Sequence, residues 1–284
     1  MELNKQTYSN VATSDNKALV VYLLDISWSM GAPMQNGKSR LEVVMDALRF
    51  VLTEMVQRSL RQNKIRPRYR VAMIAYSDKL WNVHDGIQTI DKIKGVPNLT
   101  PQERTNTALG FKYVKKILED DIKTWSPEDQ RLCPAPLVVH MTDGTLNEIA
   151  EDPEPIVKQI QAIKVPDGNV LVENIYITDD INTPPAEISN WPGYQHGQDL
   201  KNPYANKLLA MSSKIPESYR LLINNHQTST SLNLSPSAAM MFPGITPEFV
   251  RQAFAINGVS STLANKAPDP RDEWDEDKKF PVKG

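Results

Sequence analysis

The stretch ALVVYLLDISWS, residues 18–29, decides the fold of this 284-residue chain. Residues 18–24 are apolar without interruption. A strand has this pattern when helices cover both of its faces, as they do in a parallel sheet. We therefore expect a central parallel strand here, with Asp25 at its carboxyl end.

Helix-like and strand-like patterns alternate along the rest of the chain. Apolar spacings of three and four indicate helices, whereas short apolar runs bounded by turn-forming residues indicate strands. These patterns predict helices at 39–61, from Thr105 onward, and at 156–163, 202–213 and 246–256, and strands at 69–76, 79–83, 136–141, 170–177 and 219–223. The alternation favours a Rossmann-like α/β fold, with a doubly wound, mostly parallel central sheet flanked by helices.

Composition divides the chain into three predicted parts. An N-terminal arm covers residues 1–14, the α/β domain covers 15–225, and a C-terminal extension covers 226–284. Within the domain, closely spaced prolines predict a Pro-rich insertion at about 179–200. The extension holds the predicted helix at 246–256, and its last stretch is so poor in apolar residues that we expect a mobile acidic tail.

Charge and cysteine content limit the classes of partner and the cellular compartment that we expect. Lys and Arg number 32 against 34 Asp and Glu, so no excess of positive charge is available for nucleic acid or an anionic membrane surface. Cys133 is the single cysteine, which argues against internal disulfides and cysteine-based metal sites and favours a reducing compartment. The sequence shows no signal-like or membrane-spanning apolar segment. We therefore expect a cytoplasmic protein without membrane insertion.

Oxygen-bearing side chains are concentrated after the predicted buried strands. Asp25, Ser27 and Ser29 occupy alternate positions, so their side chains project to the same side of an extended turn. Asp143 follows a later buried strand, and Thr105 opens a helix at the same edge of the sheet. An all-oxygen set of this kind suits Mg²⁺, Mn²⁺ or Ca²⁺, and it leaves a coordination position for a carboxylate on a partner. The alternative is that these residues only cap helices and form turns.

At these positions the sequence resembles the von Willebrand factor type A (vWA) family. The metal-ion-dependent adhesion site (MIDAS) of that family has an Asp-x-Ser-x-Ser string, a Thr in a later loop and an Asp after a later strand. All five positions are filled, by Asp25, Ser27, Ser29, Thr105 and Asp143. The resemblance covers about residues 15–225. It implies that these five residues hold a divalent cation, with Mg²⁺ favoured, in a non-enzymatic protein–protein interaction module.

The sequence shows no signal segment and is short, and in both respects it resembles intracellular, bacterial-type stand-alone vWA proteins. This resemblance implies a scaffold for an intracellular complex, with bacterial stress response as its setting. The partner would present an Asp or Glu to the metal. The partners that the resemblance implies are an AAA+ ATPase of the MoxR type or a kinase and phosphatase pair.

Trp28 departs from the family pattern, which usually has Gly between the two serines. A tryptophan does not easily adopt positive φ angles, so metal binding could be weakened or lost in a degenerate, metal-free site. One interpretation makes Trp28 an exposed aromatic contact for the partner, because Trp is enriched at interface hot spots. The other folds its indole back against Met30 or Met34.

An enzymatic alternative uses the same residues. A Mg²⁺-dependent phosphatase or phosphotransferase would use Asp25 as its nucleophile and would hold the metal with Asp143. Phosphatases that resemble haloacid dehalogenases place a second Asp two residues after the nucleophile, and Ser27 stands there in this chain. The sequence also has no nucleophile elbow and no glycine-rich nucleotide loop. We therefore expect a binding module rather than an enzyme.

Overall fold

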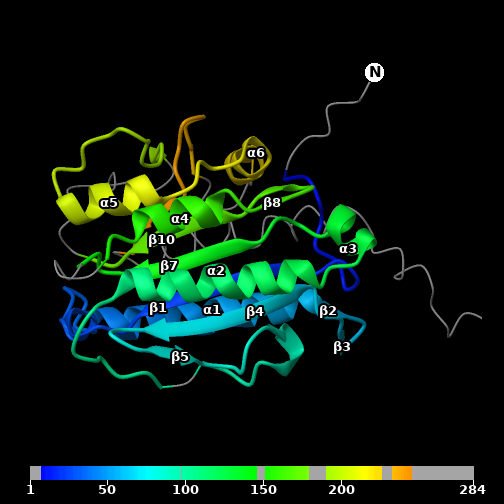
Figure 1. Cartoon of the computed structure of the whole chain (residues 1–284), viewed down its shortest axis with the longest axis horizontal. Coiled ribbons are helices and arrows are strands. Elements are labelled where there is room, and N and C mark those ends of the chain that lie inside the picture. Colours follow the sequence, from blue (N-terminus) through cyan, green and yellow to red (C-terminus); the bar gives the residue numbers. More distant parts are fainter. Residues whose placement is uncertain (1–7, 97, 146–150, 179–189, 226–231, 245–284) are drawn as a thin grey trace, which may run out of the picture.

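The computed structural model describes residues 8–96, 98–145, 151–178, 190–225 and 232–244. Its centre is one seven-stranded sheet in the order β11-β10-β7-β1-β4-β5, with β6 paired beside β4 (Figure 1). The strands are β1 (Ala18–Asp25), β4 (Tyr69–Tyr76), β5 (Leu80–Asn82), β6 (Gln88–Thr89), β7 (Leu137–Thr142), β10 (Leu171–Tyr176) and β11 (Met241–Pro243). Strands β11, β10, β7, β1 and β4 are parallel, whereas β5 and β6 run antiparallel to β4. The predicted doubly wound, mostly parallel sheet is confirmed.

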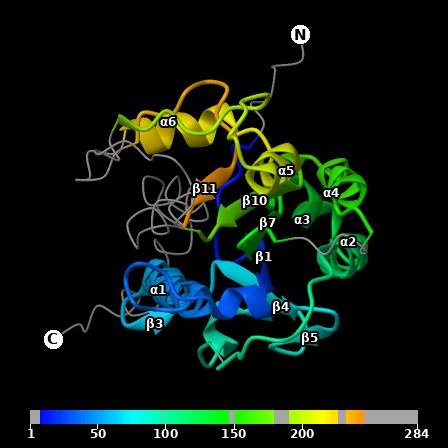
Figure 2. The ribbon, with the colours of Figure 1, turned by 90° about the vertical axis from the view of Figure 1, so that its left-hand side faces the viewer.

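Helices cover both faces of the sheet. Figure 2 shows α1 on one side and α2, α4 and α5 on the other. The helices are α1 (Arg40–Ser59), α2 (Thr107–Lys123), α3 (Pro127–Leu132), α4 (Glu154–Gln161), α5 (Pro203–Met211) and α6 (Glu217–Asn225), with two short 3-10 helices, η1 (Trp28–Gly31) and η2 (Ile90–Lys92). Two small hairpins complete the described elements, β2 (Leu60–Arg61) with β3 (Lys64–Ile65) and β8 (Lys164–Val165) with β9 (Gly168–Asn169).

Local sequence signals place the elements around the central strand. β1 is buried along its whole length, as its uninterrupted apolar run predicts. Ser39 and Glu42 form a capping box that begins α1. In α2, a Cβ on Gly110 would lie 3.0 Å from Leu23 Cδ1 and 3.2 Å from Tyr76 Cγ. The missing side chain at Gly110 therefore allows α2 to pack closely on the sheet.

The predicted strand at 219–223 is wrong, because this segment lies in the helix α6 (Glu217–Asn225). Tyr219 and Ile223 are both buried and stand four residues apart, which is a helical spacing. Pro216 directly precedes the helix, where a fixed φ favours helix initiation. A run this short fits either periodicity, and tertiary packing selects the helix.

The sheet continues past residue 225, where we placed the end of the α/β domain. β11 pairs in parallel with β10, with Asn174 beside Met241 and Tyr176 beside Pro243. We did not predict this strand, because a run of three residues that ends in proline is too short to show a period. We also did not predict α3, which begins with a capping box of Ser126 and Asp129.

Several predicted segments lie outside the described residues, namely 179–189 of the insertion and the helix and tail of the C-terminal extension.

The described end of the N-terminal arm packs on the domain. The backbone amides of Ser9 and Asn10 each donate to Asp167 Oδ1 at 2.9 Å. In the part of the chain that the structure describes, no helix is both long and apolar enough to cross a membrane.

Candidate metal-ion site

The predicted site residues lie at the carboxyl edge of the sheet, the end toward which the β4 arrow points in Figure 1. Asp25 ends β1 and Asp143 directly follows β7, and these two parallel strands are neighbours. Ser27 caps the start of η1, and Ser29 is the second residue of this short helix. The strand order therefore brings both carboxylates and the serine string to one edge.

Asp25 is held by donors on both of its oxygens. The backbone amide of Ser27 donates to Oδ1 at 2.8 Å, and the hydroxyl of Thr142 donates to Oδ2 at 2.6 Å. The Asp25 side chain is fully buried. Burial raises the pKa of Asp25 to about 6, although the hydrogen bonds from Thr142 and Ser27 oppose this shift. Asp25 is thus a rigid carboxylate that is largely ionised at neutral pH.

The two serine hydroxyls lie beside this carboxylate. Ser27 Oγ and Ser29 Oγ are 3.1 Å apart, and the Ser27 side chain is buried. Each oxygen keeps lone-pair capacity that this contact does not use. The alternate spacing in the sequence therefore does bring the two hydroxyls together.

Asp143 is buried and has a cationic neighbour that the sequence analysis missed. Its Oδ2 accepts from Arg40 Nη1 at 2.7 Å, and its Oδ1 accepts from the backbone amide of Thr145 at 3.0 Å. Arg40 is the first residue of α1, and its Nη1 also lies 3.3 Å from the carbonyl oxygen of Ser29. Arg40 therefore neutralises one of the two carboxylates and connects it to the serine string.

Thr105 lies in the loop before α2, which docks on the same turn. The amide of Gln102 donates to the carbonyl of Ile26 at 2.6 Å, and the amide of Asn106 donates to the carbonyl of Ser77 at 2.8 Å. These bonds fix the loop on both sides of Thr105, whose side chain is largely buried. Among the described residues, no hydrogen bond joins Thr105 to the other four predicted ligands.

Trp28 is exposed at the rim of the site. Its relative exposure is 76%, whereas Met30 and Met34 are buried at 0% and 5%, so the indole does not fold back between them. Trp28 is not among the described residues that have a positive φ, so its backbone needs no glycine-like conformation. Tyr204 is also exposed, and its Cβ lies 3.1 Å from the position of a Cβ built on Gly144, the residue after Asp143.

Other titratable groups do not extend the site. Within the described ranges, no group of three or more His, Cys, Asp or Glu side chains is placed to hold a metal. His140 is a buried core residue, with Nε2 at 2.7 Å from the Tyr76 hydroxyl and Nδ1 at 2.8 Å from Asn174 Oδ1. Burial lowers the pKa of His140 to about 4. A cation at the carboxyl edge would therefore need hydroxyl ligands beside Asp25 and Asp143.

Comparison with solved structures identifies the fold. Proximal thread matrix protein 1 from the mussel byssus is 15% identical, with a TM-score of 0.50 over 87% of this chain and 48% of that one. A structure of the same protein with a zinc-occupied MIDAS motif is 13% identical, with a TM-score of 0.44 over 89% and 47%. The pilus adhesin SpaC from Lactobacillus rhamnosus GG is 12% identical, with a TM-score of 0.53 over 90% and 32%. A von Willebrand factor type A protein from Catenulispora acidiphila is 13% identical, with a TM-score of 0.40 over 63% and 42%.

These likenesses are likenesses of fold alone, because every identity is low. The chain spans about half of the mussel protein and about a third of the adhesin. No protein-family model and no curated protein matches the sequence. With TM-scores of 0.50 and 0.53, the mussel protein and the adhesin show, together with the strand order and the helices on both faces, that the chain has a vWA-type fold.

Proposed function

We propose that this vWA-type domain is a protein interaction module that binds a divalent cation at the carboxyl edge of its sheet. Through the cation it binds a carboxylate of a partner protein. One observation carries the proposal: two serine hydroxyls 3.1 Å apart stand beside a buried carboxylate that is already held by two donors. The binding groups thus lie together at one point of the sheet edge.

The donor set fits a hard dication. Neighbouring oxygen ligands of an octahedral ion with bonds of about 2.1 Å lie about 3 Å apart, which matches the separation of the Ser27 and Ser29 hydroxyls. Asp25 and Asp143 supply the negative charge, and Thr105 lies in the loop docked on the same turn. When bound, such a cation supplies a Lewis-acidic position for an outside oxygen. Mg²⁺ is the favoured ion, with Mn²⁺ and Ca²⁺ as alternatives, and zinc joins the test because one structure of the mussel protein has a zinc-occupied MIDAS motif.

The residues favour binding over catalysis. Phosphatases that resemble haloacid dehalogenases need a second Asp two residues after the nucleophile, but Ser27 stands at that position here. The exposed rim instead carries Trp28, a residue type enriched at interface hot spots. These features support a contact surface around the cation, with Trp28 beside the partner's Asp or Glu.

Cation binding is tested by calorimetric titration of the whole chain with Mg²⁺, Mn²⁺, Ca²⁺ and Zn²⁺. We expect one site per chain, weakened at least tenfold in Ser29→Ala because a ligand oxygen is lost. Ser237→Ala removes an exposed hydroxyl elsewhere in the chain and serves as the matched control. Equal binding by both variants would contradict the proposed site.

Carboxylate recognition is tested with an array of peptide pairs that differ only by Asp or Asn at one position. We expect binders among the Asp peptides in Mg²⁺, loss of binding in EDTA, and no binding by the Asn twins. Trp28→Ala should weaken the peptides that bind while leaving cation affinity unchanged. Binding that persists in EDTA would point to a metal-independent interface instead.

A further inference from the structure

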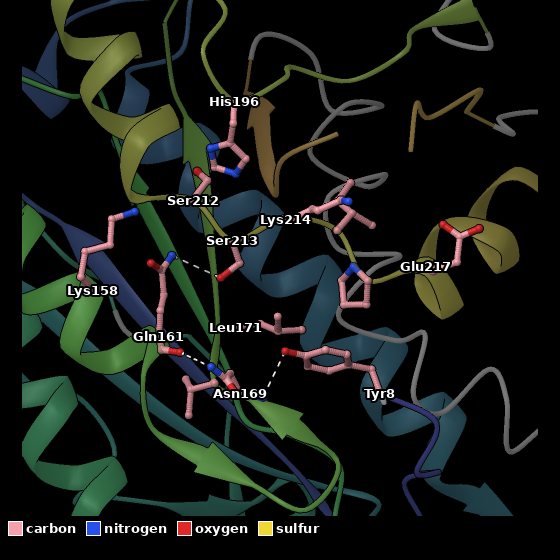
Figure 3. A pocket seen from close by; sticks show the side chains of 13 residues that line it. Tyr8, Lys158, Gln161, Asn169, Leu171, His196, Ser212, Ser213, Lys214 and Glu217 are labelled. Carbon is pink, nitrogen blue, oxygen red and sulfur yellow. Dashed lines mark hydrogen bonds between the residues drawn. The ribbon is translucent and has the colours of Figure 1, made fainter. Parts of the chain in front are cut away.

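A second candidate site lies at the opposite end of the sheet, where β10 begins. It is a pocket of about 440 Å³ lined by residues of α4, β9, the start of β10 and the segment between α5 and α6. This volume is in the range of small-molecule sites. Figure 3 shows Lys158, His196 and Lys214 around its upper half and Tyr8, Leu171 and Asn169 around its lower half. None of these residues belongs to the candidate metal-ion site.

The backbone holds His196 and Lys214 on one support. Ala239 donates its amide to the carbonyl of Tyr194 at 2.7 Å, close to His196. On the other side, Met240 donates to the carbonyl of Ser213 at 2.7 Å, next to Lys214. The extended segment around Ala239 therefore fixes the two loops that carry His196 and Lys214.

Lys158 approaches the same pocket from α4. Its Nζ donates to the carbonyl of Ala210 at 2.6 Å, which uses one of its three N–H donors. Burial lowers the pKa of His196, and the charges of Lys158 and Lys214 lower it further. Within the described residues, neither lysine forms an ion pair with a carboxylate.

The remaining polar groups offset only part of this positive charge. Glu217 is the one acidic side chain among the described lining residues, and Arg220 donates to both of its oxygens, at 2.9 and 2.5 Å. The Ser213 hydroxyl oxygen accepts from the amide of Val172 at 2.9 Å, so its proton is available to donate. The Tyr8 hydroxyl likewise accepts from the amide of Asn169 at 3.0 Å. The pocket thus offers two ammonium groups and two hydroxyls against one carboxylate, which Arg220 already holds.

We propose that this pocket binds a small organic phosphate monoester. Two ammonium groups suit a dianion as point charges, and the hydroxyls add directed donors to its oxygens. Leu171, Ile215 and Pro216 supply an apolar wall for the organic part of the ligand, beside the ring of Tyr8. The phosphoryl group lies between Lys158 and Lys214, and the ester substituent lies toward Tyr8.

The proposal is tested by calorimetric titration of the whole chain with phenyl phosphate, inorganic phosphate, benzoate and phenol. EDTA is present throughout, so that a cation at the other edge of the sheet cannot bind the anion. We expect the tightest binding for phenyl phosphate, about tenfold weaker binding for inorganic phosphate and for benzoate, and no binding for phenol. Phenyl phosphate should also shift the ring resonances of His196 in NMR spectra and leave those of the buried His140 unchanged.

Matched variants locate the binding. Lys158→Gln and Lys214→Gln should each weaken phenyl phosphate about tenfold, since each removes one charge-assisted contact. Lys79→Gln makes the same charge change at an exposed position next to the far edge strand β5, and it should leave affinity unchanged. Far-ultraviolet circular dichroism confirms that each variant is folded. The proposal is overturned if phenyl phosphate does not bind at millimolar concentration, or if it binds the double lysine variant as tightly as Lys79→Gln.

Discussion

Asp25 and Glu173 are both fully buried carboxyl groups of the same sheet, and their surroundings differ completely. Asp25 ends β1, where the Thr142 hydroxyl and the Ser27 amide donate to its two oxygens. Glu173 lies inside β10, and in the described structure neither of its oxygens has a hydrogen-bond partner. Burial raises the pKa of Asp25 to about 6 and that of Glu173 well above its ordinary value.

The difference shows why burial alone does not make a binding site. At Asp25, donors compensate part of the desolvation, so the ionised form is available at neutral pH. At Glu173 no hydrogen-bond donor compensates the desolvation, so its surroundings favour the protonated form and make it a poor anionic ligand. Chain position decides this difference: the end of a parallel strand meets turn amides and hydroxyls, whereas the middle of a strand between packed layers does not.

The largest expected effect is on cation affinity, and it should differ between variants of the two carboxyl groups. Asp25→Asn keeps the volume of the side chain but removes its charge, so we expect Mg²⁺ and Mn²⁺ affinity to fall at least a hundredfold, about 2.7 kcal/mol. Glu173→Gln makes the same type of change and should leave cation affinity within about twofold. Calorimetric titration of both variants checks this contrast. Equal losses in both would mean that the two groups act alike.

The next effect concerns stability, and here Glu173 is the sensitive group. Its folded-state pKa lies above the unfolded value, so the folded protein keeps a proton that the unfolded chain loses above about pH 4.3. The contribution of Glu173 to wild-type stability therefore falls by up to about 1.4 kcal/mol per pH unit above that point, until the folded-state pKa is reached. Glu173→Gln has no such proton and should become progressively more stable than wild type as pH rises.

Urea unfolding in EDTA at several pH values between 4.5 and 7.5 measures this divergence. Asp25 titrates in both proteins, so its contribution cancels in the difference. Glu103→Gln changes an exposed carboxyl group and should follow wild type across the range. Parallel curves for wild type and Glu173→Gln would show that Glu173 is ionised or partnered in solution.

The pH dependence of cation affinity tests the other half of the comparison. A cation competes with the proton on Asp25, whose pKa is about 6. Affinity should be nearly constant above pH 7 and should fall about tenfold per pH unit well below pH 6, because a proton must leave for each cation bound. Titration with Mn²⁺ at pH 5, 6, 7 and 8 checks the slope. A constant affinity down to pH 5 would place the cation away from Asp25.

The sequence predicts this edge of the sheet well because its signals are local. A continuous apolar run followed by Asp25, and a second run followed by Asp143, place both carboxylates at strand ends without knowledge of the tertiary structure. Thr142 and Arg40 were missed because their contacts join residues 117 and 103 positions apart. No spacing rule reports such contacts. The direction of the Trp28 indole was equally undecided, because either orientation is compatible with the same short helix.

The smallest expected effect is that of replacing Arg40, which tests how a paired cationic side chain affects a buried carboxylate. Arg40→Gln would remove the guanidinium that pairs with Asp143. The Asp143 side chain, which is only 1% exposed, would then resemble Glu173. The metal-free protein should then lose about 1 kcal/mol of stability, since the guanidinium is itself partly exposed. Cation affinity should rise about fivefold, because the incoming charge no longer shares Asp143 with Arg40.

These two changes have opposite signs, and that makes the Arg40 prediction specific. Lys38→Gln removes an exposed ion pair with Asp46 close to the same helix end, and it should change neither quantity by more than about twofold or 0.5 kcal/mol. Thermal unfolding in EDTA and Mn²⁺ titration of both variants measure the pair of effects. A cation affinity that falls in Arg40→Gln would mean that the guanidinium orients Asp143 for the cation. In that case Arg40 would support Asp143 as Thr142 supports Asp25, and it would not compete with the cation for Asp143.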